Sequence, residues 1–296
     1  MLVIPKHQVH YAFDPEIPPA AYADSGQEIR FCCQDCYREQ ITADHFDYAK
    51  LDLSRGNPAT GPLYIRQAEP GDVLRVEILE IHLAETGSMC VRPGAGLYAI
   101  TKSSCRRFPV RDGWIGFDQG LRLRALPMIG VIGTAPAGDP VLTKVPGEHG
   151  GNLDIRDMGA GSVLYLPVNV PGALLSLGDL HALQEDGETA ICGLEISGEV
   201  RVRVDVLKGR GDIPTPFLLA RDRYLTTAAH PSLDRAAELA GRKMHRFLQE
   251  HTGLSEAQSA MLLSLAGKLR ISQVVNPAKG CVMEFPVGLA GEEFRR

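Results

Sequence analysis

The stretch Val-Arg-Val-Arg-Val-Asp-Val at residues 200–206 decides the fold class of this chain. Valines alternate with charged residues, so in an extended strand the valines share one face and the charges share the other. Such a strand packs one face on a core and exposes the other to water. Residues 72–81 predict a second strand, whose apolar pattern slips at Ile78-Leu79 and indicates a bulge or burial of both faces. The chain is therefore expected to be mainly β.

Short apolar segments punctuated by Gly and Pro continue this pattern over the first two-thirds of the chain. Many strands with almost no helix predict a β-sandwich or a barrel-like body. The two strands above follow similar Gly-acid pairs, Gly71-Asp72 and Gly198-Glu199, which indicates a possible internal duplication.

The composition changes after the β-rich part. Apolar residues recur at helical spacing from Leu233 to Leu248, and Gly253 ends that helix. Ser255 and Gln258 form a capping-box pattern for a second helix, which Gly267 ends, and residues 271–275 predict a closing strand. We expect residues 1–228 to form the β-rich body and residues 229–296 to pack on it as a helical pair with a closing strand.

Composition also excludes some classes of protein. The net charge of −5 and the lack of a basic stripe argue against a nucleic-acid partner. The N-terminus lacks the pattern of a signal peptide, and no apolar run approaches the roughly 20 residues that span a bilayer. These features predict a soluble, cytoplasmic protein without a membrane partner. The seven cysteines are an odd number and mostly scattered, as expected of free thiols in a reducing compartment.

Two segments concentrate imidazole and carboxylate groups among small residues. They are residues 149–154, His-Gly-Gly-Asn-Leu-Asp, and residues 178–188, which begin Gly-Asp-Leu-His and end Asp-Gly-Glu. Glycine lets the backbone turn sharply or approach a ligand closely. Histidines and carboxylates are common zinc ligands and common general acids and bases. The pattern indicates a site that polarises a carbonyl and activates water.

A hairpin prediction restricts the partners of His181. Residues 173–177 and 189–196 are expected to be strands joined by a tight turn at Asp186-Gly187. With a two-residue turn, His181 lies opposite Cys192 and shares its face with Glu188, while Glu195 points to the other face. One extra loop residue would reverse that orientation, so Glu195 stays a candidate ligand of lower rank.

Structural interpretations of the same residues remain open. His181 could be a satisfied core histidine, and the acidic hairpin tip could simply be solvated. His149 and Asp154 could belong to a surface turn in which the aspartate caps its own backbone. Cys33 and Cys36 have metal-type spacing, but no second pair follows, so ordinary thiols are expected. Asp35, between them, is a possible site carboxylate, and His10 could line a cleft or fray with the terminus.

Ordered short motifs give the chain a resemblance to the acetamidase/formamidase family of amidohydrolases. The motifs lie at residues 57–62, 68–74, 130–137, 149–154, 165–168 and 178–188. The resemblance implies a largely β-fold with a C-terminal helical part, hydrolysis of small amides to a carboxylic acid and ammonia, and assembly into a homo-oligomer. Two departures concern substrate preference: Glu185 replaces a usual Gly, and Phe13 replaces the Trp of a His-x-x-Trp pattern.

The resulting hypothesis is a metal-assisted amidase that acts on formamide-like or acetamide-like substrates. Asp154 and His181 hold a divalent cation, with zinc as the first candidate and calcium as the second, and His149 or Glu195 is a third ligand. Glu188 is the general base and then protonates the leaving amine. Asn152, or backbone N–H groups near Gly150-Gly151, binds the oxyanion.

Two alternatives keep the same fold. One is a metal-binding β-sandwich that acts as a lyase or isomerase on a small polar substrate with the same ligands. The other is a non-catalytic small-molecule binding protein on an amidase scaffold, which the extra charge of Glu185 favours.

Overall fold

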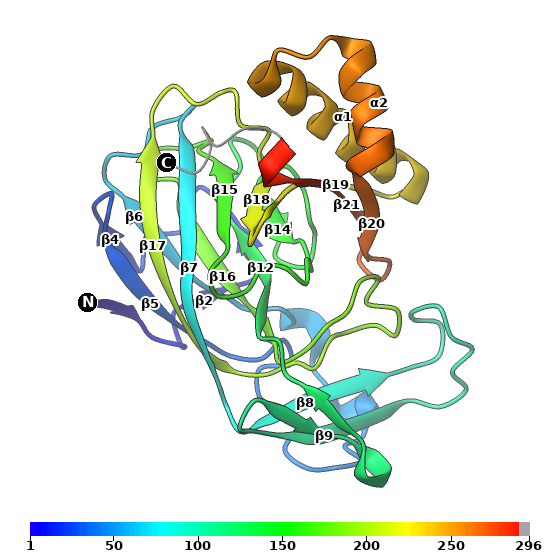
Figure 1. Cartoon of the computed structure of the whole chain (residues 1–296). Coiled ribbons are helices and arrows are strands. Elements are labelled where there is room, and N and C mark those ends of the chain that lie inside the picture. The colour runs from blue at the N-terminus through cyan, green and yellow to red at the C-terminus, as the bar shows by residue number, and fades with distance from the viewer. Residues whose placement is uncertain (290–296) are drawn as a thin grey trace.

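Two large β-sheets form the body of the protein (Figure 1), in a computed structural model that describes residues 1–289. The nine-stranded sheet has the order β1-β5-β17-β7-β15-β18-β19-β21-β20 and the six-stranded sheet has β14-β12-β16-β6-β2, with β4 paired to β6. The mainly β prediction is confirmed, and each sheet within residues 1–289 is open, so no closed barrel forms there.

The strands of the nine-stranded sheet are β1 (Leu2–Ile4), β5 (Glu28–Cys33), β7 (Val73–Leu83), β15 (Val163–Pro167), β17 (Gly198–Leu207), β18 (Phe217–Ala220), β19 (Arg223–His230), β20 (Lys268–Gln273) and β21 (Lys279–Pro286). Those of the six-stranded sheet are β2 (Val9–His10), β4 (Ala21–Ala23), β6 (Ala59–Ile65), β12 (Met128–Gly133), β14 (Gly150–Asn152) and β16 (Leu175–His181). The smaller sheets contain β3 (Ala12–Phe13) with β13 (Val141–Leu142), and β8 (Thr86–Val91), β9 (Ser104–Arg111), β10 (Trp114–Gly116) and β11 (Arg122–Arg124). Short 3-10 turns cover Tyr48–Lys50, Leu53–Arg55, Asp118–Gly120 and Val287–Leu289.

The main core lies between the two large sheets. The valines of β17 at 200, 202 and 204 are fully buried, and they belong to one apolar cluster with Ile129 of β12 and Leu177 of β16. The charged face of β17 instead forms ion pairs, including Arg201 with Glu28 and Glu80. The alternating pattern therefore sets which face of the sheet meets the core, as predicted.

The pattern slip in the second predicted strand is a bulge. In the β17–β7 ladder, Arg201 pairs with Glu80 and Val202 pairs with Ile78, which leaves Leu79 as the extra residue. One extra residue reverses the alternation of the faces, so the apolar side chains before and after the slip can both reach the core.

Two C-terminal helices, α1 (Leu233–Thr252) and α2 (Glu256–Ala266), pack at the end of the body where β18, β19, β20 and β21 lie (Figure 1). Met244, Phe247 and Leu248 of α1 join Phe217 and Tyr224 in a second apolar cluster. As predicted, Gly253 ends α1, where it adopts a left-handed conformation with a φ of 69°. The predicted capping box of Ser255 and Gln258 is also present. The closing strand begins at Lys268, three residues earlier than expected, because it pairs with β21 along its length.

The helical segment is continuous with the body. Strand β19 contains the predicted 228/229 boundary and bridges β18 and β21 in the nine-stranded sheet. The division into two parts packed as one unit stays a prediction. Within residues 1–289, none of the helices combines the length and apolarity that a membrane span requires.

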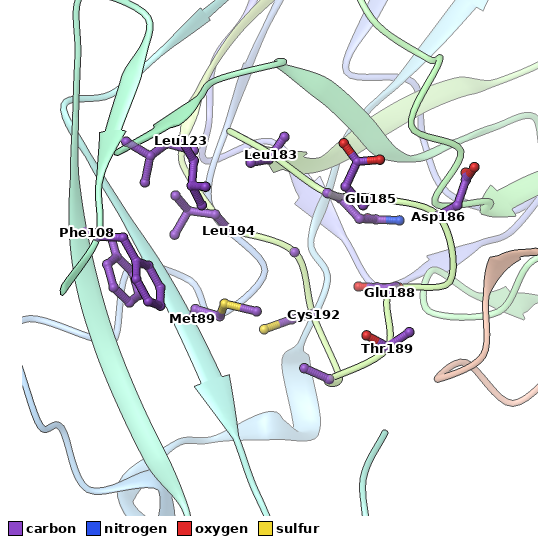
Figure 2. A pocket seen from close by; sticks show the side chains of 15 residues that line it. Met89, Phe108, Leu123, Leu183, Glu185, Asp186, Glu188, Thr189, Cys192 and Leu194 are labelled. Atoms are coloured by element: carbon purple, nitrogen blue, oxygen red, sulfur yellow. The ribbon is translucent and has the colours of Figure 1, made fainter. Parts of the chain in front are cut away.

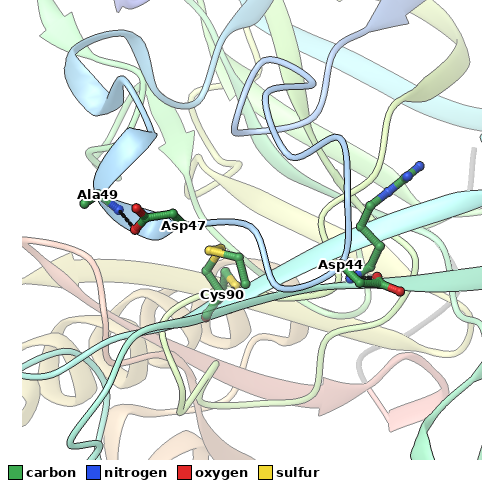
Figure 3. Close-up of a disulfide and its surroundings, with 7 residues drawn as sticks. Asp44, Asp47, Ala49 and Cys90 are labelled. Carbon is green, nitrogen blue, oxygen red and sulfur yellow. Dashed lines mark hydrogen bonds between the residues drawn. A yellow bond between two sulfur atoms is a disulfide. The ribbon is translucent and has the colours of Figure 1, made fainter.

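A disulfide between Cys90 and Cys105 joins β8 to β9, and Figure 3 shows it beneath residues 44–49. Asp47 orders that covering segment by accepting a hydrogen bond from the backbone N–H of Ala49 at 3.0 Å. The expectation that every cysteine is a free thiol is therefore wrong for this pair, because neighbouring strands place the two residues directly opposite each other. The free cysteines are 32, 33, 36, 192 and 281.

Reduction of this disulfide should destabilise the lobe formed by β8–β11. The bridge closes a loop with a sequence separation of 15 residues, for which chain-entropy arguments give about 3 kcal/mol of unfolding free energy. Urea unfolding of the oxidised protein with and without dithiothreitol measures the effect. Cys281→Ser, at a free thiol far along the chain, is the control that should keep the dithiothreitol dependence. Seven alkylatable thiols in the denatured, unreduced protein would show that the bridge does not form.

Candidate functional site

The loop that follows β16 departs from the predicted hairpin. Residues 189–196 are not a strand, and His181 forms its bridge with Glu195 rather than with Cys192. The Asp186-Gly187 segment does not turn back on β16 because its backbone pairs elsewhere. The N–H of Gly187 donates to the carbonyl of Ser272, and its carbonyl accepts from Val274.

Strand β16 and this loop direct three ionisable side chains to one point. Asp179 and His181 lie two residues apart at the end of β16. The His181 Nε2 atom lies 3.0 Å from Glu195 Oε1 and 3.7 Å from Asp179 Oδ1. Glu195, the lower-ranked candidate, thus lies directly beside the imidazole.

Asp154 reaches the same place from the end of β14, the edge strand of the six-stranded sheet. Its Oδ2 accepts a hydrogen bond from Asn276 Nδ2 at 2.7 Å, and its backbone carbonyl accepts one from Gln184. Asn276 also donates to the carbonyl of Asn152 at 3.2 Å. Segments more than 100 residues apart along the chain therefore fix this carboxylate.

Within residues 1–289, potential metal-ligating atoms form two buried groups. One atom each from Asp154, His181 and Glu188 lie within 4.8 Å of one another, and we call these residues the first donor group. Atoms from Cys36, Asp179 and Glu195 satisfy the same criterion and form the second donor group. Asp154 and His181, the two residues on which the metal hypothesis depends, are thus side by side.

Burial and mutual repulsion dominate the electrostatics of the site. Burial, followed by the charge of Asp179, raises the pKa of Asp154 to about 6. Burial also raises the pKa of Glu195 to about 8 and that of Glu188 well above its ordinary value, with Asp154 adding to the latter shift. Burial alone would lower the pKa of His181, but the carboxylates of Glu195 and Asp179 raise it well above its usual range.

Several polar atoms at this point have no hydrogen-bond partner within the described chain. They include four carboxylate oxygens: Asp154 Oδ1, Asp179 Oδ1, Glu188 Oε2 and Glu195 Oε2. Leaving a buried carboxylate oxygen unpartnered costs free energy, so native proteins rarely retain such groups without a function or a bound ion. These oxygens indicate a site that receives a ligand.

Backbone conformation supports the same interpretation. Asp154, Asp179 and Glu188 all have positive φ angles, of 46°, 56° and 44°. Aspartate tolerates this region moderately well, whereas a residue such as glutamate occupies it at a cost of order 1–3 kcal/mol. Such strained residues concentrate at functional sites.

The glycine at position 130 on β12 makes room for two of the carboxylates. A Cβ atom there would lie 2.7 Å from Asp154 Oδ1 and 2.8 Å from Asp179 Oδ2. Both distances are shorter than any ordinary contact of a methyl group, so only glycine fits between these side chains.

Other predicted site residues lie outside the two donor groups. His149 packs edge-on against Phe13 at 5.0 Å, and burial lowers its pKa to about 4. Asp35 organises the turn after β5, because its Oδ1 accepts the backbone N–H groups of Tyr37 and Glu39. His10 is buried and hydrogen-bonds to Ser176, so it neither frays nor joins the groups.

Sequence reasoning missed four residues of the site: Cys36, Asn57, Asp179 as a site carboxylate, and Asn276. Asn57 donates to Asp179 Oδ2 at 3.0 Å. Asp179 had a local signal, its position two residues before His181, and Cys36 had the CxxC spacing that it shares with Cys33. The others arrive through tertiary contacts that no local pattern shows.

Two pockets meet at the loop after β16. A polar pocket of about 260 Å³ is lined by Cys36, Asn152, Asp179, Glu188, Glu195 and Asn276, among others. An apolar pocket of about 340 Å³ lies on the other side, where Phe108, Leu123, Leu183 and Leu194 gather (Figure 2). Glu188 lines both pockets. The polar pocket is the candidate active site, because Glu188 of the first donor group and all three residues of the second donor group line it.

These features define a class: a two-sheet β protein with a buried carboxylate–imidazole centre beside a small polar pocket. The family model of the Acetamidase/Formamidase family matches residues 3–144 and 137–289. The chain therefore belongs to the acetamidase/formamidase family.

Named relatives agree with this assignment. A crystal structure of an acetamidase from Bacillus halodurans is 42% identical with a TM-score of 0.95, and the match covers 97% of this chain and 98% of that one. An acetamidase of Mycolicibacterium smegmatis is 28% identical, over 68% of this chain and 66% of its own length. A formamidase of Methylophilus methylotrophus is 26% identical, over 68% of this chain and 64% of its own length. The chain thus spans slightly less than two thirds of these curated relatives.

Gly130→Ala should destabilise the protein by about 1–3 kcal/mol, the usual cost of overpacking a filled interior, because the new methyl group forces Asp154 and Asp179 apart. Urea unfolding at pH 7 measures the change. Gly138→Ala is the matched control, since open space surrounds Gly138, and it should stay within about 0.5 kcal/mol of the original protein. Equal stability of both variants would show that the carboxylates do not flank Gly130.

Proposed function

We propose that this protein hydrolyses the C–N bond of small linear amides, formamide-like or acetamide-like, to a carboxylate and ammonia. The observation that carries the proposal is the first donor group, Asp154, His181 and Glu188, beside the polar pocket. Relatives named acetamidase and formamidase support it. A pocket of about 260 Å³ accommodates several groups of the size of a water molecule, each ~30 Å³, and so suits a small amide.

A divalent cation fits the first donor group. Asp154 Oδ1 and Glu188 Oε2 are buried and unpartnered, and within residues 1–289 no Lys or Arg forms an ion pair with either carboxylate. Asp154 and His181 would hold the ion. Their mixture of oxygen and nitrogen donors suits zinc better than calcium, because calcium prefers oxygen ligands alone. When bound, such an ion lowers the pKa of water and polarises a carbonyl group.

The residues around His181 would fix its ring. Glu195 and Asp179 flank Nε2, and outer carboxylates of this kind hold the orientation and tautomer of metal-ligating histidines. Gly193 lets the loop approach the ring, since a Cβ there would lie 2.8 Å from His181 Nδ1. Of the two candidate third ligands, Glu195 lies beside His181, whereas His149 is outside both donor groups.

Glu188 would move the protons. It belongs to the first donor group and also lines the pocket, so Oε2 can take a proton from the attacking water and deliver it to the departing nitrogen. That delivery matters because an unprotonated amide ion is a very poor leaving group. General acid–base catalysis of this type typically contributes about 10²–10⁴ in rate.

Asn152 would stabilise the oxyanion. Its Nδ2 donates to Asn276 Oδ1 at 3.2 Å, which leaves one amide N–H for the tetrahedral intermediate. A donor of this kind is worth on the order of 3 kcal/mol. Asn152 is 4% exposed, and the low dielectric of a buried position strengthens this interaction.

The binding-protein alternative loses its main support. Glu185, the rim carboxylate that favoured it, forms an ion pair with Arg156 on the surface, so its charge is compensated. Cytoplasmic location and homo-oligomeric assembly stay predictions of this proposal.

Removal of the ion should destabilise the protein. At a free Zn²⁺ concentration of about 100 times the dissociation constant, binding adds about 2.7 kcal/mol to the free energy of unfolding. Urea unfolding of chelator-treated protein, before and after Zn²⁺ addition, measures this gain. Asp154→Asn should lose most of it, whereas Asp35→Asn, also at a buried carboxylate, should retain it. If Zn²⁺ stabilises Asp154→Asn as much as it stabilises the original protein, Asp154 is not a ligand of the ion.

Glu188→Gln should lower ammonia release from formamide and acetamide by about 10²–10⁴, because a neutral amide cannot relay the proton. Glu185→Gln, in the same loop, is the matched control and should retain the original rate. Circular dichroism checks that both variants fold. A full rate in Glu188→Gln would assign the proton transfer to another group, and no ammonia release by the original protein from any small amide would overturn the proposed function.

A further inference from the structure

We propose that the second donor group, Cys36, Asp179 and Glu195, is a second cation site with a thiolate ligand, so that the pocket holds a two-metal centre. The inference extends the proposed function, which uses only the first donor group. Three segments build the second group: the turn after β5, strand β16, and the residue that bridges β16 to β8. One atom from each residue lies within 4.8 Å of the other two.

An independent observation points to a ligand there. Asp179 and Glu195 are each 2% exposed, and Asp179 Oδ1 and Glu195 Oε2 have no hydrogen-bond partner within the described residues. Asn57 satisfies only the other oxygen of Asp179. Two buried, unpartnered carboxylate oxygens in one group need a cation or a proton to be stable.

Charge balance favours a second ion over a single shared one. Asp154, Asp179, Glu188 and Glu195 place four carboxylates in one buried region, and within residues 1–289 their only ion-pairing base is His181. One divalent cation neutralises two of these four carboxylates. A second ion neutralises the other two, and as a direct ligand partner it also favours the deprotonated form of the Cys36 thiol.

The second group is also better placed toward the substrate. All three of its residues line the polar pocket, as does Glu188, whereas Asp154 and His181 do not. An ion held by the second group would therefore face the amide directly. In two-metal sites, one ion stabilises the attacking oxygen and the other stabilises the charge that develops on the substrate.

Among the five free thiols, Cys36 alone has this environment. The Sγ atom of Cys33 donates to the carbonyl of Leu177, and that of Cys192 donates to the carbonyl of Cys90. A soft thiolate favours zinc-like ions over calcium or magnesium. The second site should therefore be selective for zinc and cobalt, and Cys36 determines that selectivity.

Cobalt substitution tests the proposal. The full-length protein is freed of metal by chelation and titrated with Co²⁺, and bound cobalt is counted by elemental analysis. The expected result is two ions per chain, with a near-ultraviolet thiolate-to-cobalt charge-transfer band. Cys36→Ser should lose the band and retain one ion. Cys192→Ser, at a thiol that lines the same pocket outside both groups, should keep two ions and the band.

The outcomes separate this inference from the proposed function. One ion per chain in the original protein, or a band that survives in Cys36→Ser, overturns the second site. If circular dichroism shows that Cys36→Ser does not fold, Asp179→Asn replaces it and should likewise retain one ion and lose the band. If the original protein binds two ions but releases no ammonia from small amides, the result contradicts amide hydrolysis and still supports the second site.

Discussion

The burial of four carboxylates around one imidazole, without a lysine or arginine partner in the described chain, is the constraint on which the site depends. Such a cluster is unstable in a dry interior unless protons or cations compensate it. The surrounding structure supplies the geometry that holds it together. Asn57 and Asn276 each bind one carboxylate, Gly130 leaves space between two of them, and Glu195 lies against the imidazole.

The two-sheet body explains how this charged cluster is tolerated. Strand β16 lies between β12 and β6, so its backbone is paired on both sides. Leu177 and Leu180 are fully buried in the main core, whereas Asp179 and His181 contribute atoms to the two donor groups. The positive φ of Asp179, 56°, breaks the regular alternation of β16 at this point, so these two side chains reach the site from the last residues of the strand.

Local patterns in the sequence predict those parts of the fold that local interactions determine. The valine–charge alternation of β17, the slip at Leu79 and the cap at Ser255 all reflect contacts within a strand or a helix turn. The Asp186-Gly187 hairpin fails because Gly187 bonds to the end of β20, more than 80 residues away. A turn signal gives the conformation that a dipeptide prefers, but not the strand that competes for its backbone.

The site was accessible to sequence reasoning only in part. Asp154 and His181 stood out as ionisable residues beside glycines, and the structure brings them together. The roles of Cys36 and Asn276 depend on tertiary placement, and the CxxC spacing instead directed attention to Cys33 as a partner. Asp35, within that motif, serves the turn, while its neighbour Cys36 reaches the pocket.

The hydrogen bond from Asn276 to Asp154 has a consequence for biosynthesis. Cys36 and Asn57 leave the ribosome early, but the pocket is incomplete until residue 276 has emerged and the β20–β21 segment has folded onto the sheet. Contacts of such large sequence separation form late and slowly. The nascent chain therefore carries its acidic cluster without this hydrogen bond while the 122 residues that separate Asn276 from Asp154 are made.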